Sequence, residues 1–220
     1  MEKPILFNTE MVKAILAGRK TQTRRLPSSS IRDAWLSWDE YQCAVAPPGS
    51  ILATEEGFYK KHPPYKEGDI LYVRETWKQA TGGTAGPGLF DTYLYKADEP
   101  QDTTGLMVEG CWHPSIHMPK KAARIFLRVN EIHIERLQSI SEDDALAEGA
   151  SGGEYFDEQG NSMGIVWPHE DFSQIWDSTI KAEDIPLYGW DANPWVWVIK
   201  FERVNRFCYQ TEIVETAERL

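Results

Sequence analysis

The stretch ARIFLRVNEIHIERL, residues 123–137, constrains the fold more than any other part of the chain. Apolar side chains occupy every second position in each half of this stretch, and the phase of the alternation shifts near Asn130. Alternation with a period of two residues is typical of a β-strand with one buried face. A shift of phase indicates a bulge or a bend. We therefore expect one long strand here, or two bent strands.

A short amphipathic helix is predicted near the N-terminus. Thr9 belongs to the residue types that cap helices, and it precedes a set of apolar residues with helical spacing. Gly18 follows them and is expected to end the helix, because glycine readily adopts the left-handed conformation that closes a helix C-terminus. The apolar side consists of Met11, Val12, Ile15 and Leu16.

Other patterns predict strands and helices in an order that favours an α+β fold. EGDILYVRETW, residues 67–77, begins with a Gly-Asp turn and continues as a strand with both faces partly buried, as in a barrel. DTYLYKA and NPWVWVIKFERV read as further strands, and HEDFSQIWDSTI reads as a helix. SISEDDALAEGA is a helix with Ser141 as its cap and Gly149 as its end. Because helices do not alternate regularly with strands, we expect a small mixed barrel and not βαβ units.

We expect a single domain at residues 1–203, followed by a polar tail at residues 204–220. Nine tryptophans are distributed through most of the chain, so neither half lacks apolar residues. Residues 27–66 are rich in Pro, Ser and Gly and are predicted to form a long irregular insert at the surface. Residues 151–185 are a second, weakly constrained insert. The stretch TGGTAGPG at residues 81–88 is predicted to be a flexible loop, because it lacks the Lys-Ser/Thr of a phosphate loop.

The net charge indicates which partners to expect, and the cysteine content indicates the compartment. A net charge of −11 argues against broad electrostatic binding to duplex nucleic acid, which depends on many phosphate contacts. Three cysteines, odd in number and far apart, are typical of a reducing cytoplasm. The N-terminus lacks the apolar core of a signal peptide, and no apolar run approaches membrane-spanning length. We expect a cytoplasmic protein with no membrane partner.

Positive charge is concentrated in one segment of this acidic chain. From Met11 to Arg32 there are six Lys or Arg and no Asp or Glu. Such a local concentration indicates a site for something anionic or carbonyl-bearing.

Within this segment, the relation between Lys20 and Thr23 depends on the backbone. On a regular strand these residues would lie on opposite faces, whereas in a tight turn after Gly18 the first and fourth residues come within about 7 Å. In the turn, a hydroxyl would lie beside an amine whose pKa is lowered by neighbouring like charges. The alternative is that these cations are solvated and complement the helix dipole. The neighbouring cations are Arg19, Arg24 and Arg25.

The pattern Gly18-x-Lys20-x-x-Thr23-x-Arg25 behind a short helix resembles the signature of the ASCH domain family, a branch of the PUA-like β-barrels. GDILYVRETW resembles the Gly-Asp strand of larger members, and SISEDDALAEG resembles a helix ending in Glu-Gly. In length and in NPWVWVIKFE the chain is similar to members carried by phages and prophages. The resemblance extends over about residues 3–202 and implies a PUA-like mixed β-barrel with flanking helices and long inserts.

Small bacterial members of this family are amidohydrolases that remove acetyl from N4-acetylcytidine. The resemblance implies Lys20 as proton acceptor, Thr23 as nucleophile and Glu148 as proton donor, with no metal and no cofactor. Because this chain is about twice the size of those enzymes, its inserts leave the acyl group and the substrate open. Candidate substrate-binding residues are Arg19, Arg24, Arg25, Arg74, Glu75 and Trp77, the last as a platform for a base.

A second hypothesis comes from the same resemblance. PUA-like barrels commonly bind RNA or modified bases, so the basic loop could bind a nucleoside or single-stranded RNA without amidohydrolase chemistry, or as part of a ribonuclease. In structural terms Arg74 and Glu75 could instead form ion pairs, with Trp77 in the core. The stretch CWHPSIHM suggests zinc only superficially, because Pro114 breaks any helix and no second Cys/His cluster is near. The oligomeric state stays open.

Overall fold

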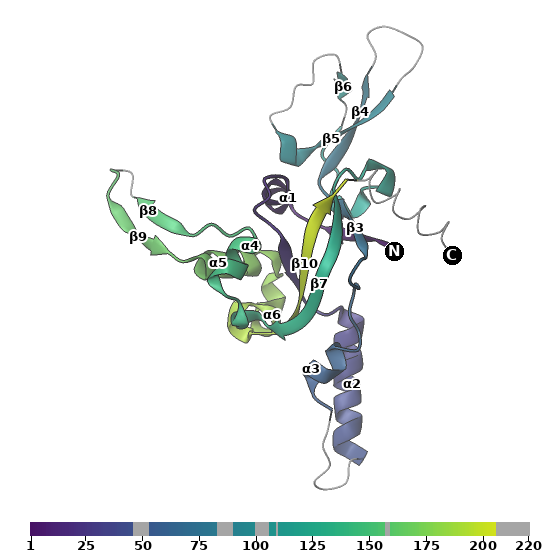
Figure 1. The fold of residues 1–220 in the computed structure, drawn as a ribbon, viewed down its shortest axis with the longest axis vertical. Helices are drawn as coiled ribbons and strands as arrows, with labels where there is room; N and C mark the ends of the chain where they lie inside the picture. Colours follow the sequence, from purple (N-terminus) through teal and green to yellow (C-terminus); the bar gives the residue numbers. More distant parts are fainter. Residues whose placement is uncertain (46–52, 83–89, 100–105, 109, 157–158, 206–220) are drawn as a thin grey trace. The chain divides into compact units, whose positions relative to one another are not determined.

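The computed structural model shows a mixed α+β protein (Figure 1). It describes residues 1–45, 53–82, 90–99, 106–108, 110–156 and 159–205. The chain divides into two compact units, each built from separate segments. The first unit contains Met1–Gly18, Gly68–Arg128 and the chain from Glu202 onward, and the second contains Arg19–Glu67 and Val129–Phe201.

A five-stranded mixed sheet has the order β1-β3-β7-β10-β2. β1 (Glu2–Leu6) is parallel to β3 (Ile70–Arg74), which is antiparallel to β7 (Phe126–Arg136). β10 (Trp195–Val204) is antiparallel to β2 (Gln22–Arg25). Among the described residues no sheet closes on itself, since β1 and β2 are the end strands of this one. The α+β class is therefore observed, and the expected closed barrel is not.

The long alternating stretch forms one continuous strand, as its sequence indicates. β7 and β10 are neighbours in the sheet and are the two longest strands in Figure 1. The phase shift falls at Asn130 and Glu131, two consecutive residues that are both exposed. Beyond these two residues, Ile134 is the buried position of the strand. The shift of phase thus bends the buried face without ending the strand.

Helix α1 (Thr9–Leu16) begins the first unit's helical structure, but its cap differs from the predicted one. Asn8 Oδ1 accepts a hydrogen bond of 2.9 Å from Met11 N. Asn8 has extended backbone angles, whereas Thr9 is already helical, so Asn8 and not Thr9 is the N-cap. Gly18 has φ +73° and ends the helix as predicted.

The predicted strand at residues 67–77 is divided in two. After β3 the chain passes through Glu75 and begins β4 (Trp77–Gly82), which lies between β5 (Phe90–Tyr95) and β6 (Leu106–Val108) in a three-stranded sheet. Most of the predicted loop at 81–88 lies outside the described residues. Three short 3-10 helices complete this unit: Lys96–Asp98, Ser115–His117 and Lys120–Ala122. Its core cluster consists of Ile70, Trp77, Met118, Ala122, Ala123 and Phe126.

The predicted irregular insert at residues 27–66 is largely helical, which corrects the sequence interpretation. It contains α2 (Ser29–Val45) and α3 (Glu55–Tyr59). The prolines of this segment flank α2 and do not interrupt it, because no Pro or Gly occurs within its bounds. The rings of Trp35 and Phe58 lie 5.5 Å apart and connect the two helices.

The rest of the second unit contains the two predicted helices, a short third helix and an unpredicted hairpin. Helix α4 (Glu142–Ala147) is capped by Ser141. Helices α5 (Pro168–Thr179) and α6 (Ile185–Tyr188) follow the hairpin of β8 (Gly153–Phe156) and β9 (Ser162–Val166). Short 3-10 helices span Leu137–Ser139, Ala182–Asp184 and Trp190–Ala192. The core cluster consists of Leu137, Ala145, Ala150, Phe172, Trp176 and Val196.

Two further expectations concern the ends and the surface of the chain. Val204 is the last residue of β10, and residues 206–220 of the predicted tail lie outside the described part. Within the described ranges, none of the helices combines the length and the apolar character that crossing a bilayer requires.

Candidate functional site

The basic segment enters β2 directly, so the tight turn from Lys20 to Thr23 is not formed. Residues 19–21 are irregular, and Thr23 lies inside β2, opposite Ile199 of β10. Two backbone hydrogen bonds of 2.9 Å hold the segment: Thr21 N donates to Ala147 O, and Phe201 N donates to Thr21 O. The segment is thereby fixed against both the end of α4 and the strand β10.

Lys20 and Glu148 form a buried ion pair, although 128 positions separate them. Lys20 Nζ donates to Glu148 Oε2 at 2.7 Å and to the backbone oxygen of the same residue at 2.7 Å. The exposed fractions of the two side chains are 0% and 3%. Glu148 is the C-cap of α4, and Gly149, with φ +96°, ends the helix there. The sequence Glu-Gly therefore places this carboxylate at a helix end that faces Lys20.

Arg24 organises the carboxylates around this pair. Its Nη1 donates to Glu148 Oε1 at 3.2 Å, and its Nε and Nη2 donate to Glu135 Oε1 at 3.1 and 2.6 Å. Asp144 Oδ2 lies 3.7 Å from Nη2. The guanidinium group is therefore shared among three carboxylates, and each oxygen of Glu148 contacts a different cation.

The alternation of β2 separates its side chains into two faces. Gln22 Nε2 donates to the backbone oxygen and Oδ1 of Asp144 at 3.0 and 3.1 Å, so Gln22 shares the α4-facing side with Arg24. Thr23 and Arg25 occupy the alternate positions of the strand. Thr23 is 1% exposed, and its side chain is therefore part of the interior of this unit.

Burial dominates the electrostatics of the pair. Removal from water lowers the pKa of Lys20, and the nearby positive charges of Arg25 and Arg24 lower it further, while Glu148 opposes these effects. Burial also lowers the pKa of Arg25, against the influence of Glu148. A buried lysine with a lowered pKa and a carboxylate partner is typical of sites that move protons, although structural ion pairs share this property.

Arg19, the remaining basic candidate, differs in burial from Lys20 and Arg24. Arg19 is exposed, and its Nη1 donates to Gly149 O at 3.4 Å. The structure thus brings Lys20, Arg24 and Glu148 into direct contact and leaves Arg19 at the surface of the same unit.

The other candidates belong to the first unit and have partners there. Glu75 is 1% exposed and accepts from Arg124 Nε and Nη2, at 3.0 Å each. Burial raises the pKa of Glu75, and Arg124 opposes this effect. Arg74 Nε donates to Met118 O at 2.9 Å. Trp77 is part of the core cluster and Glu75 forms an ion pair, so these two match the structural alternative, whereas Arg74 donates to backbone oxygens. That the three residues share a pocket with Lys20 stays a prediction.

Sequence reasoning missed two carboxylates of the site. Asp144 is four positions before Glu148 on the same helix, a spacing that places both on one face, and this signal was available in the sequence. Burial would raise the pKa of Asp144, but hydrogen bonds from Ser141 and Gln22 and the charge of Arg24 lower it overall. Glu135 comes from β7, and nothing in its local pattern indicates Arg24 as its partner.

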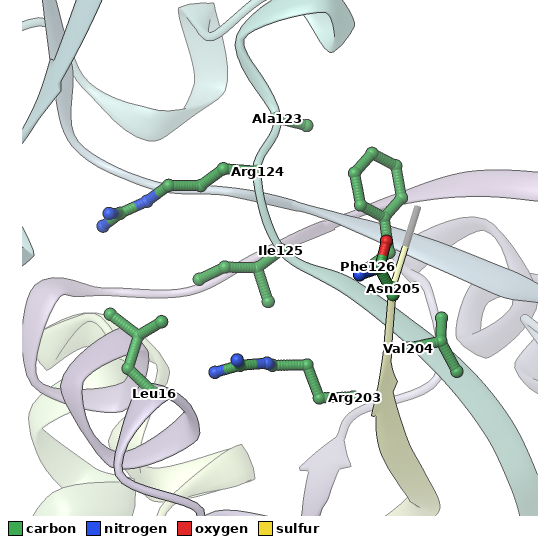
Figure 2. Close-up of a pocket in the computed structure, with 8 residues that line it drawn as sticks. All are labelled: Leu16, Ala123, Arg124, Ile125, Phe126, Arg203, Val204 and Asn205. Carbon is green, nitrogen blue, oxygen red and sulfur yellow. The ribbon is translucent and has the colours of Figure 1, made fainter. Parts of the chain in front are cut away.

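A cavity of about 640 Å³ lies in the first unit (Figure 2). Figure 2 shows the side chains of Arg124 and Arg203 extending in the same direction on either side of Ile125, toward Leu16. Arg124 is held by Glu75 and therefore forms a fixed part of the wall. The lining includes two cations and no carboxylate; its other residues are Ala123, Phe126, Val204 and Asn205.

No protein-family model, curated protein or solved structure matches this chain. Within the described ranges, no group of three or more His, Cys, Asp or Glu is placed to hold a metal ion. The ASCH resemblance is therefore a proposal, and the buried contacts around Lys20 are the observations that bear on it.

Proposed function

We propose that this chain is a metal-independent amidohydrolase that removes an acyl group from a modified nucleoside or base such as N4-acetylcytidine. The observation that carries the proposal is the buried contact of 2.7 Å between Lys20 Nζ and Glu148 Oε2. The ASCH resemblance gives these two residues the roles of proton acceptor and proton donor. The PUA-like barrel implied by the same resemblance is part of this proposal, and the observed α+β class is compatible with it.

The ion pair can supply both the base and the acid that amide cleavage needs. In the ionised pair the proton is on Lys20 Nζ, and the carboxylate of Glu148 accepts a hydrogen bond from it. Transfer of that proton along the hydrogen bond produces a neutral amine and a carboxylic acid. Because burial lowers the pKa of Lys20, the neutral amine is more accessible than for a lysine in water.

The proposed reaction then balances in two stages. The proposal requires Thr23 Oγ1, which lies on the other face of β2 from Arg24, to come within reach of Lys20 when the substrate binds. Thr23 Oγ1 then bonds to the acyl carbon while its proton passes to the neutral Lys20. The carbon–nitrogen bond breaks, and Glu148 gives its proton to the departing exocyclic nitrogen. Water next hydrolyses the acyl ester on Thr23: the water oxygen bonds to the acyl carbon, Thr23 regains a proton, and the carboxylic acid leaves. Lys20 and Glu148 end as the ion pair from which they began.

The arginines have different parts in this scheme. The guanidinium of Arg24 is engaged by three carboxylates, so its role is to hold Glu148 and not to contact substrate. Arg25 lies close enough to Lys20 and Glu148 to influence the pKa of Lys20, and it is our candidate for stabilising the oxyanion. Because Lys20 and Thr23 are 2% and 1% exposed, the substrate must displace a neighbouring segment to reach them.

The experiment is incubation of the pure protein with N4-acetylcytidine and a panel of acylated nucleosides, with detection of the deacylated product. Thr23→Ser keeps a hydroxyl and is expected to retain measurable turnover. Thr23→Val keeps the shape and removes the hydroxyl, and is expected to abolish turnover while the protein stays folded. Equal turnover in these two variants, or no product from any substrate with the wild type, would overturn the proposal.

One observation argues for a structural role of the ion pair, which is compatible with the second candidate function, a module that binds RNA or a modified base without cleaving an amide. Each oxygen of Glu148 already contacts a cation, as expected of a structural network. In that case RNA affinity should fall steeply with salt and should be the same in Thr23→Val and the wild type. The net charge of −11 favours a single nucleotide over a long polyanion as the ligand.

A further inference from the structure

Arg24 reaches Glu148 while its guanidinium is held from another strand. Arg24 belongs to β2 and Glu135 to β7, and β10 lies between these two strands in the sheet. The side chains of Arg24 and Glu135 together therefore span about 10 Å, which is two strand spacings. The side chain of Arg24 is 0% exposed, so its charge has to be met by protein groups.

Glu135 holds one edge of this guanidinium with a single oxygen. Arg24 Nε and Nη2 both donate to Glu135 Oε1, at 3.1 and 2.6 Å. Arg24 Cζ lies over the ring of Phe172, 5.9 Å from its centroid. Because a guanidinium is planar and rigid, fixing the edge of Nε and Nη2 also fixes the direction of Nη1. In this orientation Nη1 donates to Glu148 Oε1 at 3.2 Å.

The orientation of Arg24 determines how the two oxygens of Glu148 are used. With Oε1 bound to Arg24, Oε2 is the oxygen that accepts from Lys20 Nζ at 2.7 Å. A carboxylate that could rotate would not keep one oxygen in front of Lys20. Proton exchange between Lys20 and Glu148 depends on this alignment, because proton transfer requires a donor and an acceptor held within hydrogen-bond distance.

Asp144, the third carboxylate beside Arg24, does not hold the guanidinium in the same way. Its Oδ2 lies 3.7 Å from Arg24 Nη2, which is longer than a hydrogen bond. The oxygens of Asp144 accept instead from Gln22 Nε2 at 3.1 Å and from Ser141 Oγ at 2.9 Å. Asp144 therefore contributes charge near Arg24, whereas Glu135 sets its direction.

We propose that Glu135 is a positioning residue of the candidate site, which acts through Arg24 to align the carboxylate of Glu148 with Lys20. Glu135 itself does not contact the substrate. Its effect on turnover rests on the proposed amidohydrolase function, whereas its effect on the contact between Glu148 and Lys20 is measurable without turnover. Because both hydrogen bonds from Arg24 end on the same oxygen of Glu135, the role requires an acceptor at this place and not a negative charge.

Two conservative variants separate the acceptor from the charge, with turnover of N4-acetylcytidine as the measurement. Glu135→Gln keeps the reach of the side chain and an acceptor oxygen but removes the charge. Its kcat should stay within about fivefold of the wild type, the difference between hydrogen bonds to a charged and to a neutral group. Glu135→Asp keeps the charge but withdraws the oxygen by one carbon–carbon bond. Its kcat should fall about tenfold or more, as expected when a hydrogen bond to a charged group is lost. KM should change in neither variant.

The matched controls are Glu131→Gln and Glu131→Asp. Glu131 belongs to the same strand but contacts other cationic groups: Oε1 lies 3.0 Å from His133 Nδ1, and Oε2 lies 3.1 Å from Lys200 Nζ. Both control variants should turn over the substrate as the wild type does. Each kcat is calculated per folded molecule, with the thermal midpoint as the check of folding, so that a loss of stability is not counted as a loss of turnover.

A second readout does not depend on turnover. Nitrogen NMR of the Lys20 ammonium group gives a chemical shift that reports its contact with Glu148. This shift should be nearly the same in Glu135→Gln and the wild type. It should change in Glu135→Asp, where Arg24 no longer holds Glu148 in one orientation.

The proposal is overturned if the Lys20 shift in Glu135→Asp equals that of the wild type, or if kcat in that variant equals the wild-type value. It is also overturned if Glu135→Gln loses as much turnover as Glu135→Asp, because the charge and not the acceptor would then matter. A wild type that deacylates none of the acylated nucleosides overturns the amidohydrolase function instead. In that case the Lys20 shift alone decides whether Glu135 aligns Glu148.

Discussion

Two buried carboxylates, one in each unit, pair with cations of different chemistry. Glu148 contacts Lys20 and Arg24. Glu75 instead accepts hydrogen bonds from Nε and Nη2 of Arg124, at 3.0 Å each. Arginine is always protonated in proteins, whereas a buried lysine can lose its proton. The first-unit pair can therefore fix geometry only, and the second-unit pair can also transfer a proton.

The surroundings of the two pairs strengthen this contrast. Arg124 also binds Asp98, and its guanidinium lies over the ring of Tyr95 at 3.9 Å, so both its edges and one face are occupied. Although burial alone would lower it, hydrogen bonds to Glu75 and Asp98 raise the pKa of Arg124. Burial instead lowers the pKa of Lys20 despite its carboxylate partner. One cation is held in its charged form, and the other is shifted toward its neutral form.

The largest expected effect separates charge from proton transfer. Lys20→Arg keeps the positive charge beside Glu148 but removes a base that can become neutral, so turnover of an acylated nucleoside should fall by about 100-fold to 10,000-fold. The measurement is product formation, with the thermal midpoint as a check of folding. Turnover within a few-fold of the wild type would show that Lys20 acts through its charge alone.

The next effect is on stability. Lys20→Met removes the cation that contacts Glu148 Oε2 and should lower the free energy of unfolding by about 3 kcal/mol, the lower end for a broken buried pair. Urea denaturation measures this change. The double variant Lys20→Met/Glu148→Gln removes both charges and keeps an acceptor for Arg24, so it should recover most of the loss. A double variant less stable than the single one would contradict this account.

The matching change in the first unit should affect stability without affecting turnover. Arg124→Lys keeps the charge and loses the two-pronged contact with Glu75, which should cost about 2 kcal/mol, as expected for hydrogen bonds between charged groups. Product formation per folded molecule should equal that of the wild type. A loss of turnover at unchanged stability would mean that the first-unit pair has a functional role and would remove the contrast.

Much of the secondary structure could be predicted because the alternation of apolar residues and the residues that cap helices act over a few neighbouring positions. The alternation of residues 123–137 indicated β7, and Ser141 with Gly149 bounded α4. Helix α2 was missed because residues 27–66 were interpreted as one segment. The prolines and glycines on either side of the helix outweighed the stretch between them that contains neither. Whether a sheet closes could not be derived from local patterns, because closure depends on pairing between distant strands; among the described residues no closed sheet is observed.

In the candidate site, too, the sequence identified several residues, whereas pairing between distant strands decided their positions. Lys20 and Arg24 were singled out within the basic segment and Glu148 through the ASCH resemblance, and the structure brings the three into contact. The position of Thr23 was less predictable, because a three-residue spacing has opposite consequences in a turn and in a strand, and pairing with β10 decides between them. Glu135 reaches Arg24 from another strand, so only the sheet register reveals it.

The smallest effect is the pH dependence of stability, which should have opposite signs for the two pairs. The pKa of Glu75 is raised above 4.5 in the folded protein, so the native state binds more protons there, and stability should fall as pH rises from 4.5 through the folded pKa. The pKa of Lys20 is lowered below 10.5, so the unfolded state binds more protons there, and stability should rise as pH approaches 10.5.

Each slope should be at most about 1.4 kcal/mol per pH unit, the value for one proton. Urea denaturation across both pH ranges measures the slopes. Glu75→Gln should lose only the acidic slope, and Lys20→Met should lose only the alkaline one. If Lys20→Met kept the alkaline slope, the lysine would titrate identically in the folded and unfolded chain, and it would have no neutral form to act as a base near neutral pH.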